Sequence, residues 1–398
     1  MSGLAYLFER FPAFTQTFCY REVDELRRQG IAPAIFSIRR PTDERPQDWD
    51  PSIVRQIEYL PGDDPLVREV DDALRKGSLP QAAKKEIQDW GRKTDFLRLY
   101  QAAYLGPRLQ TLGIRHVHAH FAGLAARTAY WIERFFGIGF SFTGHANDIF
   151  APKHFEISLV HLVGAARAVV TVSEFGVRFL QEKHPAEAAK ISCIYNGIDL
   201  APFRRADLAK SPPGLISVGR LIEKKGFADL IEACRLLCER GIEFRCEIIG
   251  EGPLEEALRA QIITAGLTKT VLLTGPLPQA EVIARLAASH LFVLPCVTEV
   301  SGGMDNLPTV LMEAMAAELP VVSTALAGVP EMVQEGVTGL LVPEHQPLQL
   351  AAAIARIMGD REFSRSLGQA GRERAEERFS IEKNAQALKV LFRRFGLE

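Results

Sequence analysis

The sequence predicts an α/β protein made of two doubly wound halves, each a parallel sheet covered by helices. Apolar, strand-like runs alternate with amphipathic helical stretches along the chain, which is the pattern of such sheets. This alternation runs through two successive series, and 398 residues with 47% hydrophobic content are enough for two separate cores. The polar stretch between the two series ends in Ser211-Pro212-Pro213-Gly214 and predicts a domain boundary near residue 208.

Six short apolar runs are expected to form the strands of each half. In the first half they are Leu4–Phe8, Ala34–Ile38, His116–Ala119, Gly139–Thr143, Val169–Val172 and Ile191–Tyr195. In the second half they are Leu215–Val218, Arg245–Ile249, Val271–Thr274, Leu291–Leu294, Val321–Ser323 and Leu340–Val342. An amphipathic helical pattern from Ile381 to Phe395 follows the last strand. Because ligands bind beyond the carboxyl ends of parallel strands, two facing sheets predict a site in the cleft between the halves.

The composition narrows the class of protein. A formal net charge of −2 gives no reason to expect nucleic acid as a partner. No basic N-terminal segment precedes a long apolar core, and no stretch reaches about 18 uninterrupted apolar residues, so a cytoplasmic chain is expected. The six cysteines contain no C-x-x-C pair and are expected to be buried, reduced thiols, although Cys234 and Cys238 could form half of a metal site.

Residues 297–323 combine a loop, a helix start and two carboxylates. Pro308 predicts the first position of a helix that runs to about Ala317, which places Asp305 just before the helix and Glu313 inside it. A helix N-terminus presents backbone N–H groups and a partial positive charge, so it can seat an anionic group such as a phosphate. The two carboxylates would then face a polar ligand that bears hydroxyl groups.

The segment from Asp305 to Thr324 resembles the signature of glycosyltransferase family 4. In that signature a Glu is followed by a Pro three positions later and by a second Glu eight positions later, before Ala-Met-Ala. Asp305, Pro308 and Glu313–Ala314–Met315–Ala316 match this layout. Asp replaces the usual Glu at the first position and shortens its reach by one methylene. The alternative is a capping Asp305 beside a solvated Glu313.

The resemblance implies the GT-B fold, in which two Rossmann-like domains face each other across a cleft. Residues 1–208 would form the acceptor-binding domain and residues 209–380 the nucleotide-sugar donor-binding domain. Residues 381–398 would form a C-terminal helix that packs back on the N-terminal domain. The resemblance is to members of the kind that assemble bacterial exopolysaccharides such as colanic acid.

Two basic residues in the run from Gly219 to Phe227 resemble the family's Gly-Arg-Leu…Lys-Gly element, which clamps the donor pyrophosphate. By position they are Arg220 and Lys225, with Lys224 as a neighbour of unassigned role. Arg can bridge two phosphate oxygens, Lys adds a compact charge, and both offset the charge that grows on a leaving nucleotide. A charged surface loop is the alternative.

The resemblance implies further site residues in both halves. The donor-binding set is Arg220, Lys225, Gly250, Leu277, Asn306, Leu307, Thr309, Val310 and Glu313. The catalytic set is His145, Asp305, Arg220 and Lys225, where His145 corresponds to the family's cleft His that contacts the donor sugar. On the acceptor side, Phe14, Thr15 and Gln16 lie in a segment like the family's Phe-Pro…Glu-Thr-Phe opening, with Gln16 where Glu is usual.

Two other features of the sequence, a row of alternating histidines and a basic segment, can each be interpreted in two ways. His116, His118 and His120 alternate along one strand and so share a face, which could suggest a metal, but the family has a similar His-x-His-Phe-Ala segment without one. Between Arg75 and Arg115 there are nine Lys or Arg against three acids, interleaved with aromatic and aliphatic residues. This segment predicts either a basic helix on an anionic membrane surface or a solvated helix packed on the domain.

We therefore expect a retaining hexosyltransferase that moves a sugar from a UDP- or GDP-sugar to a glycan or lipid-linked acceptor, with no cofactor and no metal. Its location would be cytoplasmic or peripheral on the inner face of the cell membrane. Two alternatives stay open: a non-catalytic donor- or glycan-binding subunit of an assembly complex, and a sugar phosphorylase or epimerase of the same fold.

Overall fold

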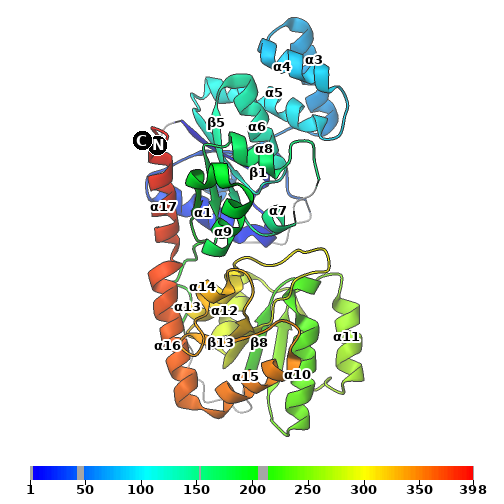
Figure 1. Cartoon of the computed structure of the whole chain (residues 1–398), viewed down its shortest axis with the longest axis vertical. Helices are drawn as coiled ribbons and strands as arrows, with labels where there is room; N and C mark the ends of the chain where they lie inside the picture. Colours follow the sequence, from blue (N-terminus) through cyan, green and yellow to red (C-terminus); the bar gives the residue numbers. More distant parts are fainter. Residues whose placement is uncertain (1–2, 43–48, 152–153, 205–213, 398) are drawn as a thin grey trace. The chain divides into compact units, whose positions relative to one another are not determined.

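The computed structural model describes residues 3–42, 49–151, 154–204 and 214–397. The chain divides into two compact units, one formed by Met1–Gly197 with Glu382–Glu398 and the other by Ile198–Ile381 (Figure 1). The boundary expected near residue 208 falls within 205–213 and so lies outside the described residues.

The first unit is built on a seven-stranded parallel sheet in the order β3-β2-β1-β4-β5-β6-β7. Its strands are β1 Leu4–Arg10, β2 Ala34–Arg39, β3 Ile57–Tyr59, β4 His116–His120, β5 Gly139–Gly144, β6 Ala168–Thr171 and β7 Ile191–Cys193. The strand order reverses between β1 and β4. The carboxyl ends of these two strands therefore form the switch point at which such sheets bind ligands.

Helices cover both faces of this sheet. They are η1 Phe14–Gln16, α1 Thr17–Arg28, α2 Pro51–Val54, α3 Asp63–Lys76, α4 Gln81–Trp90, α5 Phe96–Thr111, α6 Leu124–Phe136, α7 Asn147–Phe150, α8 Leu159–Ala165, α9 Glu174–Lys183, η2 Pro185–Lys190 and α17 Ile381–Arg393. Alternation along β1 shows the two faces: Leu7 belongs to the core under α5 and α6, while Tyr6 belongs to the core under α1 and α17. Phe392 of α17 is fully buried in that second core.

The second unit is built on a six-stranded parallel sheet in the order β10-β9-β8-β11-β12-β13. Its strands are β8 Gly214–Val218, β9 Arg245–Ile249, β10 Val271–Gly275, β11 Leu291–Leu294, β12 Val321–Thr324 and β13 Gly339–Val342. Its helices are η3 Glu223–Lys225, α10 Phe227–Glu239, α11 Glu255–Thr264, α12 Gln279–Ala287, α13 Thr309–Ala316, α14 Val329–Met332, α15 Pro347–Gly359 and α16 Arg361–Arg378. The order reverses between β8 and β11, which is the switch point of this sheet.

The predicted α/β fold with two doubly wound parallel sheets is confirmed, and every predicted strand is present with its ends within two residues of the prediction. Strand β3 was not predicted from the sequence, because its three residues are too few to show a periodic pattern. The helix predicted to start at Pro308 is one residue shorter at each end, because Pro308 and Ala317 are the caps of α13.

The basic segment 75–115 is not one helix but the end of α3, then α4 and the whole of α5. Its Lys and Arg side chains are exposed except for Arg98, which is buried beside Asp95. Leu99, Tyr100 and Leu105 are buried in the core of the unit, so the apolar residues of α5 face inward. In the part of the chain that the structure describes, no helix combines the length and the apolar character needed to span a bilayer.

Candidate active site

The loops after β8 and β11 bring three charged residues together at the switch point of the second unit. The loop after β8 carries Lys224 and Lys225, and the loop after β11 carries Asp305. Lys224 Nζ lies 3.0 Å from Asp305 Oδ1, and Lys225 Nζ pairs with Asp305 Oδ2. All three side chains are at most 12% exposed, so this is a buried ion cluster with two cations and one anion.

The electrostatics of this cluster keep Asp305 ionised. Burial alone would raise the pKa of its carboxyl, but the charges of Lys225 and Lys224 outweigh burial and lower the pKa to about 2. Burial likewise opposes the charge of Lys225, yet Asp305 raises the pKa of this ammonium overall. Cys296 Sγ lies 3.8 Å from Asp305 Oδ2, and burial raises the pKa of this thiol, which stays protonated.

Gly226 explains how the two lysines reach the loop after β11. It has φ of +66°, and a Cβ placed on it would lie 1.8 Å from the carbonyl oxygen of Pro295. Only glycine permits both this left-handed conformation and this close approach. A backbone hydrogen bond also joins the two loops, because Val297 N donates to the carbonyl oxygen of Lys224 at 3.0 Å.

Arg220 is exposed and lies on the same loop, which a second glycine holds in place. Gly250, after β9, has φ of +146°, and a Cβ there would lie 1.9 Å from the carbonyl oxygen of Gly219. Leu221 N donates to the carbonyl oxygen of Glu251 at 2.8 Å, so the loops after β8 and β9 are joined on both sides of Arg220. The structure therefore brings Arg220, Gly250, Lys225 and Asp305 to one edge of the sheet.

Helix α13 carries the second carboxylate of the motif. Glu313 is 4% exposed, and Gln279 Nε2 donates to its Oε1 at 3.4 Å. Gln279 begins α12, just after Leu277, which is half-buried in the loop that follows β10. Around the start of α13, Asn306 and Leu307 are buried, while Thr309 and Val310 are half-buried. The donor-binding residues expected from the sequence therefore all lie in loops or a helix at the carboxyl edge of this sheet.

His145 lies in the first unit, directly after β5. Asp148 fixes the turn that presents it, because its carboxylate accepts hydrogen bonds from the backbone N–H groups of Ala122, His145 and Ala146 at 2.8 to 3.1 Å. The His145 ring is buried, with ring centres of Phe18 and Phe121 at 4.8 and 4.4 Å. Burial, then the charge of His120, lowers the pKa of His145 well below its ordinary value, so the ring is neutral.

The expected acceptor-side residues Phe14, Thr15 and Gln16 form η1, after the carboxyl end of β1. Thr15 is exposed, and Phe14 and Gln16 are half-buried. Phe18 is the second residue of α1, and its contact with His145 brings the start of α1 to the turn after β5. These residues share the carboxyl edge of the first sheet.

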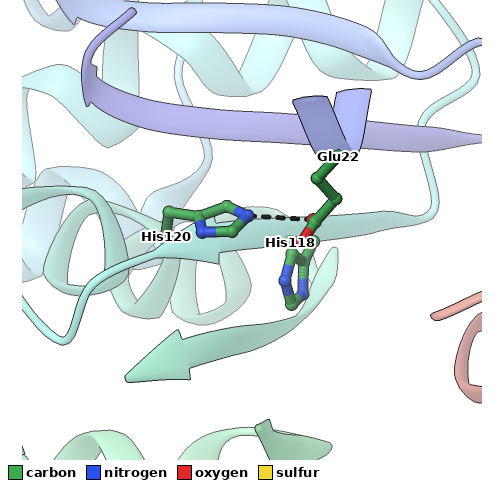
Figure 2. A group of neighbouring side chains, drawn as sticks. All are labelled: Glu22, His118 and His120. Carbon is green, nitrogen blue, oxygen red and sulfur yellow. Dashed lines mark hydrogen bonds and ion pairs between the residues drawn. The ribbon is translucent and has the colours of Figure 1, made fainter. Parts of the chain in front are cut away.

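The three alternating histidines of β4 are buried, and each forms hydrogen bonds with side chains of neighbouring elements. His116 and His118 both contact Ser141 Oγ at 2.8 Å, and His118 also contacts Thr143 Oγ1 at 3.0 Å. His120 instead contacts Glu22 of α1 (Figure 2). Two side-chain contacts were not predicted from the sequence: that of Glu22 with His120, 98 positions away, and that of Lys224 with Asp305 in the second unit. No local pattern marks Glu22, whereas the doubled lysine before Gly226 was a usable signal for Lys224.

Two known family models match this chain, one in each unit. Residues 15–202 match the family model described as Glycosyltransferase Family 4, and residues 202–374 match the one described as Glycosyl transferases group 1. The chain is 43% identical over 178 residues to the putative colanic acid biosynthesis glycosyltransferase WcaL of Salmonella typhimurium, covering 44% of this chain and 42% of that protein. It is 41% identical over 175 residues to the amylovoran biosynthesis glycosyltransferase AmsK of Erwinia amylovora, covering 44% and 42% respectively. The matched region thus spans less than half the length of these curated relatives.

Solved structures share the fold along nearly the whole chain. Sucrose-phosphate synthase from Thermosynechococcus elongatus superposes with a TM-score of 0.74 at 18% identity, covering 99% of both chains. Anabaena Alr3699/HepE in complex with UDP superposes with a TM-score of 0.70 at 16% identity, covering 98% of this chain and 99% of that one.

The two Rossmann-like parallel sheets and these neighbours define a protein of the GT-B fold class. The two family models together account for residues 15–374, so the chain carries a Glycosyltransferase Family 4 domain followed by a Glycosyl transferases group 1 domain.

Proposed function

We propose that this chain transfers a sugar from a nucleotide diphosphate sugar to a glycan or lipid-linked acceptor in cell-surface polysaccharide assembly. The two matched family models support the reaction class, and the relatives named for colanic acid and amylovoran biosynthesis support the kind of product. A structural neighbour solved with UDP-glucose supports a nucleotide sugar as donor.

The observation that carries this proposal is the excess of positive charge at the switch point of the second unit. Lys224 and Lys225 outnumber Asp305 there, and exposed Arg220 lies on the same loop. An ammonium has three N–H donors, so a lysine that is paired with Asp305 can also bind a phosphate oxygen. This arrangement suits a diphosphate, whose charge grows as it leaves.

We assign the roles as follows. Arg220 and Lys225 stabilise the departing nucleoside diphosphate, and Glu313 accepts hydrogen bonds from the donor ribose. Asp305 orders the two lysines and orients the sugar, and His145 contacts the sugar from the first unit. Phe14, Thr15 and Gln16 line the acceptor side. Gly250, Leu277, Asn306, Leu307, Thr309 and Val310 surround the donor.

Transfer would retain the anomeric configuration, as expected for this family. In front-face attack, the acceptor hydroxyl bonds to the anomeric carbon on the side from which the phosphate leaves. The anomeric carbon–oxygen bond breaks, and the departing phosphate oxygen takes the acceptor proton. Because cationic side chains and the N-terminus of α13 neutralise the leaving group, the reaction would need no divalent metal.

Contact with an anionic membrane surface would rest on charge alone. The exposed Lys84 and Lys85 of α4 and Lys93 after it could approach lipid headgroups, whereas the apolar side chains of α5 are buried in the core. Each such lysine adds about 1 kcal/mol near an anionic surface.

The test is thermal stabilisation of the full chain by a panel of UDP-, GDP- and ADP-sugars, with and without EDTA. We expect one nucleotide series to raise the melting temperature, to do so in EDTA, and to lose this effect in Arg220→Ala. Arg245→Ala is the matched control and should respond like the wild type. Arg245 is also exposed, but it is the first residue of β9 and so lies at the edge of the sheet opposite the loop that carries Arg220. Absence of stabilisation by every nucleotide sugar would contradict the proposal.

A further inference from the structure

Two buried arginines and one aspartate meet where helices α5 and α6 begin in the first unit. Arg98 lies in the first turn of α5 and Arg127 in the first turn of α6, and each residue is 3% exposed. Asp95, directly before α5, contacts both arginines. Its Oδ1 lies 3.7 Å from Arg98 Nε, and its Oδ2 lies 2.7 Å from Arg127 Nε. This arginine pair shares one buried carboxylate, which leaves one positive charge in excess.

The hydrogen bonds of the arginine pair are incomplete. Among the described residues, Arg98 Nε and Nη1 have no hydrogen-bond partner. Arg127 Nε and Asp95 Oδ2 are close, but they are too poorly aligned to form a hydrogen bond with each other. A guanidinium keeps its protons in proteins, so these buried N–H groups stay donors without an acceptor. Such groups are rare in native proteins and indicate a ligand that the protein itself does not supply.

The charge of Arg98 is compensated less well than that of an ordinary ion pair. Burial lowers the pKa of Arg98 to about 10, and the nearby Asp95 does not restore it. Burial lowers the pKa of Arg127 in the same way. By contrast, the pKa of exposed Arg108, near the other end of α5, is raised, because its guanidinium donates to Glu58. The arginine pair would therefore be stabilised by a second negative charge.

Four further charged groups act on this cluster from outside it. They are Arg39, Asp63, Glu9 and Glu156. Three of them are exposed and Glu9 is half-buried, so water and salt screen their charges more strongly than those of the arginine pair. The buried excess of positive charge is thus not cancelled by its surroundings.

The starts of the two helices favour an anion as well. α5 ends before the amino end of β4 and α6 begins after its carboxyl end, so both helices start at the carboxyl edge of the sheet. Thr128 Oγ1 donates to Gln101 Oε1 at 3.0 Å and joins the helices within their first two turns. Neither N-terminus has a side-chain cap. A helix start disfavours a nearby cation and favours an anion, so the arginine pair and the two helix starts suit the same ligand.

The arginine pair lies beneath one aromatic ring. The half-buried side chain of Phe155 lies over Arg127, with 3.6 Å between the guanidinium carbon and the ring centre. Movement of this ring would open Arg127 to a ligand. The same edge of the sheet carries η1, whose residues we assigned to the acceptor side. All residues of this cluster belong to the first unit.

We propose that Arg98 and Arg127 bind an anionic group of the acceptor, which is either the carboxylate of a sugar acid or the phosphate that joins a glycan to its lipid. Guanidinium groups bind both kinds of oxyanion through paired N–H donors. The assignment to the acceptor rests on the function proposed above, whereas the binding of an oxyanion does not.

NMR of the full chain with ¹⁵N-labelled arginine tests the binding with matched probes. Methyl glucuronide and methyl glucoside differ in a carboxylate, and geranyl phosphate and geraniol differ in a phosphate. We expect one of the two anions to shift the Nε signals of Arg98 and Arg127 and to leave that of Arg108 in place. The anion that does so identifies the source of the charge. No shift with either anion, or an equal shift with the neutral partner, would overturn the proposal.

Arg98→Gln separates binding from a structural role. It leaves Arg127 and Asp95 as a balanced pair, so we expect the melting temperature to stay at the wild-type value. The affinity for the anion should fall about tenfold, as for loss of a hydrogen bond to a charged group. Arg108→Gln, on the exposed side of the same helix, is the matched control and should keep the affinity. A loss of stability without a loss of affinity would reduce Arg98 to a structural residue.

Asp95→Asn gives a test of opposite sign. It keeps the size of the side chain and removes the carboxylate that competes for the arginine pair. We therefore expect the anion to bind about tenfold more tightly and to raise the melting temperature more than in the wild type. Weaker or unchanged binding would contradict an anion site, because a purely structural cluster gains nothing from this change.

Transfer assays connect the site with the acceptor. Arg98→Gln should raise KM for the acceptor about tenfold and leave KM for the donor unchanged. If the probes bind as expected but the wild type transfers no sugar, the anion site stands and the proposed function falls. If the wild type transfers sugar and Arg98→Gln has the same KM for the acceptor, the assignment to the acceptor is wrong.

Discussion

Asp305 is a buried carboxylate whose charge two buried lysines share. Replacement by Asn keeps the size but leaves Lys224 and Lys225 without a counter-ion. The pKa of Asp305 falls from 3.8 to about 2 on folding, and each unit corresponds to about 1.4 kcal/mol. We therefore expect Asp305→Asn to lose about 2.5 kcal/mol of unfolding free energy at pH 7, measured by urea denaturation.

The pH dependence of this loss has a definite sign. Because the folded-state pKa is depressed, the stabilisation is present above pH 3.8 and is lost as the pH falls towards 2. The difference in unfolding free energy between wild type and Asp305→Asn should thus narrow between about pH 4 and pH 2. Glu243→Gln, an exposed carboxylate of the same unit, should show no such difference. A gap that stays constant down to pH 3 would contradict the ion cluster.

The residue identities at this site were predictable, but their contacts were only partly so. Asp305, Glu313, Arg220 and Lys225 follow from motif positions, and the structure places all four at one sheet edge. That Lys224 shares Asp305 depends on how η3 packs against the loop after β11, which spacing does not encode. Glu22 was out of reach, because its partner comes from a strand that lies far away in the sequence.

The junction between η3 and α10 depends on a single backbone position. Gly226→Ala meets the Pro295 carbonyl oxygen at 1.8 Å in addition to the strain of its positive φ. Gly241→Ala has a similar φ of +71° with nothing within 4 Å, so it is the matched control for strain alone. Left-handed strain costs about 1–2 kcal/mol.

We therefore expect Gly241→Ala to lose about that amount, and Gly226→Ala to lose clearly more because its loop must move. Only Gly226→Ala should also weaken nucleotide-sugar binding, since Lys224 and Lys225 precede it directly. Urea denaturation and isothermal titration measure the two effects. Equal stabilities of the two variants would show that the contact with Pro295 is unimportant.

Helix α17 is part of the core of the first unit, although it closes the chain. Phe392 is fully buried, with ring centres of Tyr6 and His118 at 6.1 and 5.3 Å. Phe392→Ala should therefore lose about 3–5 kcal/mol in urea denaturation. Val390→Ala, 44% exposed on the same helix, should lose less than about 1 kcal/mol. Similar losses would mean that α17 does not pack as described.

Elements with clear periodicity were predictable, and those that depend on context were not. Strands β9 and β11 match the prediction residue for residue, because each ends directly before a Gly or a Pro. β3 is a three-residue edge strand without such a run. For α5, the composition of the segment could not show that its aromatic residues face the core. Counts of charged and apolar residues along the chain do not say which face of the helix each residue occupies.

The charge of the whole chain hides the local excess in segment 75–115. Formal net charge is −2, yet Lys84 and Lys85 are exposed beside further cations. If this surface meets anionic lipid, Lys84→Glu with Lys85→Glu should release the protein from vesicles that contain phosphatidylserine. Lys269→Glu, with a single exposed lysine of the second unit, is the control. If wild type and the double variant sediment equally with the vesicles, the predicted membrane contact is wrong.

Acceptor-dependent release of nucleoside diphosphate tests the transfer itself most directly. The assay combines the full chain with UDP- or GDP-sugars and with lipid-linked glycans extracted from membranes, in EDTA. We expect release that requires both donor and acceptor, persists in EDTA, and falls about 100-fold in Arg220→Ala but not in Arg245→Ala. Absence of acceptor-dependent release with every nucleotide sugar would contradict the proposed sugar transfer.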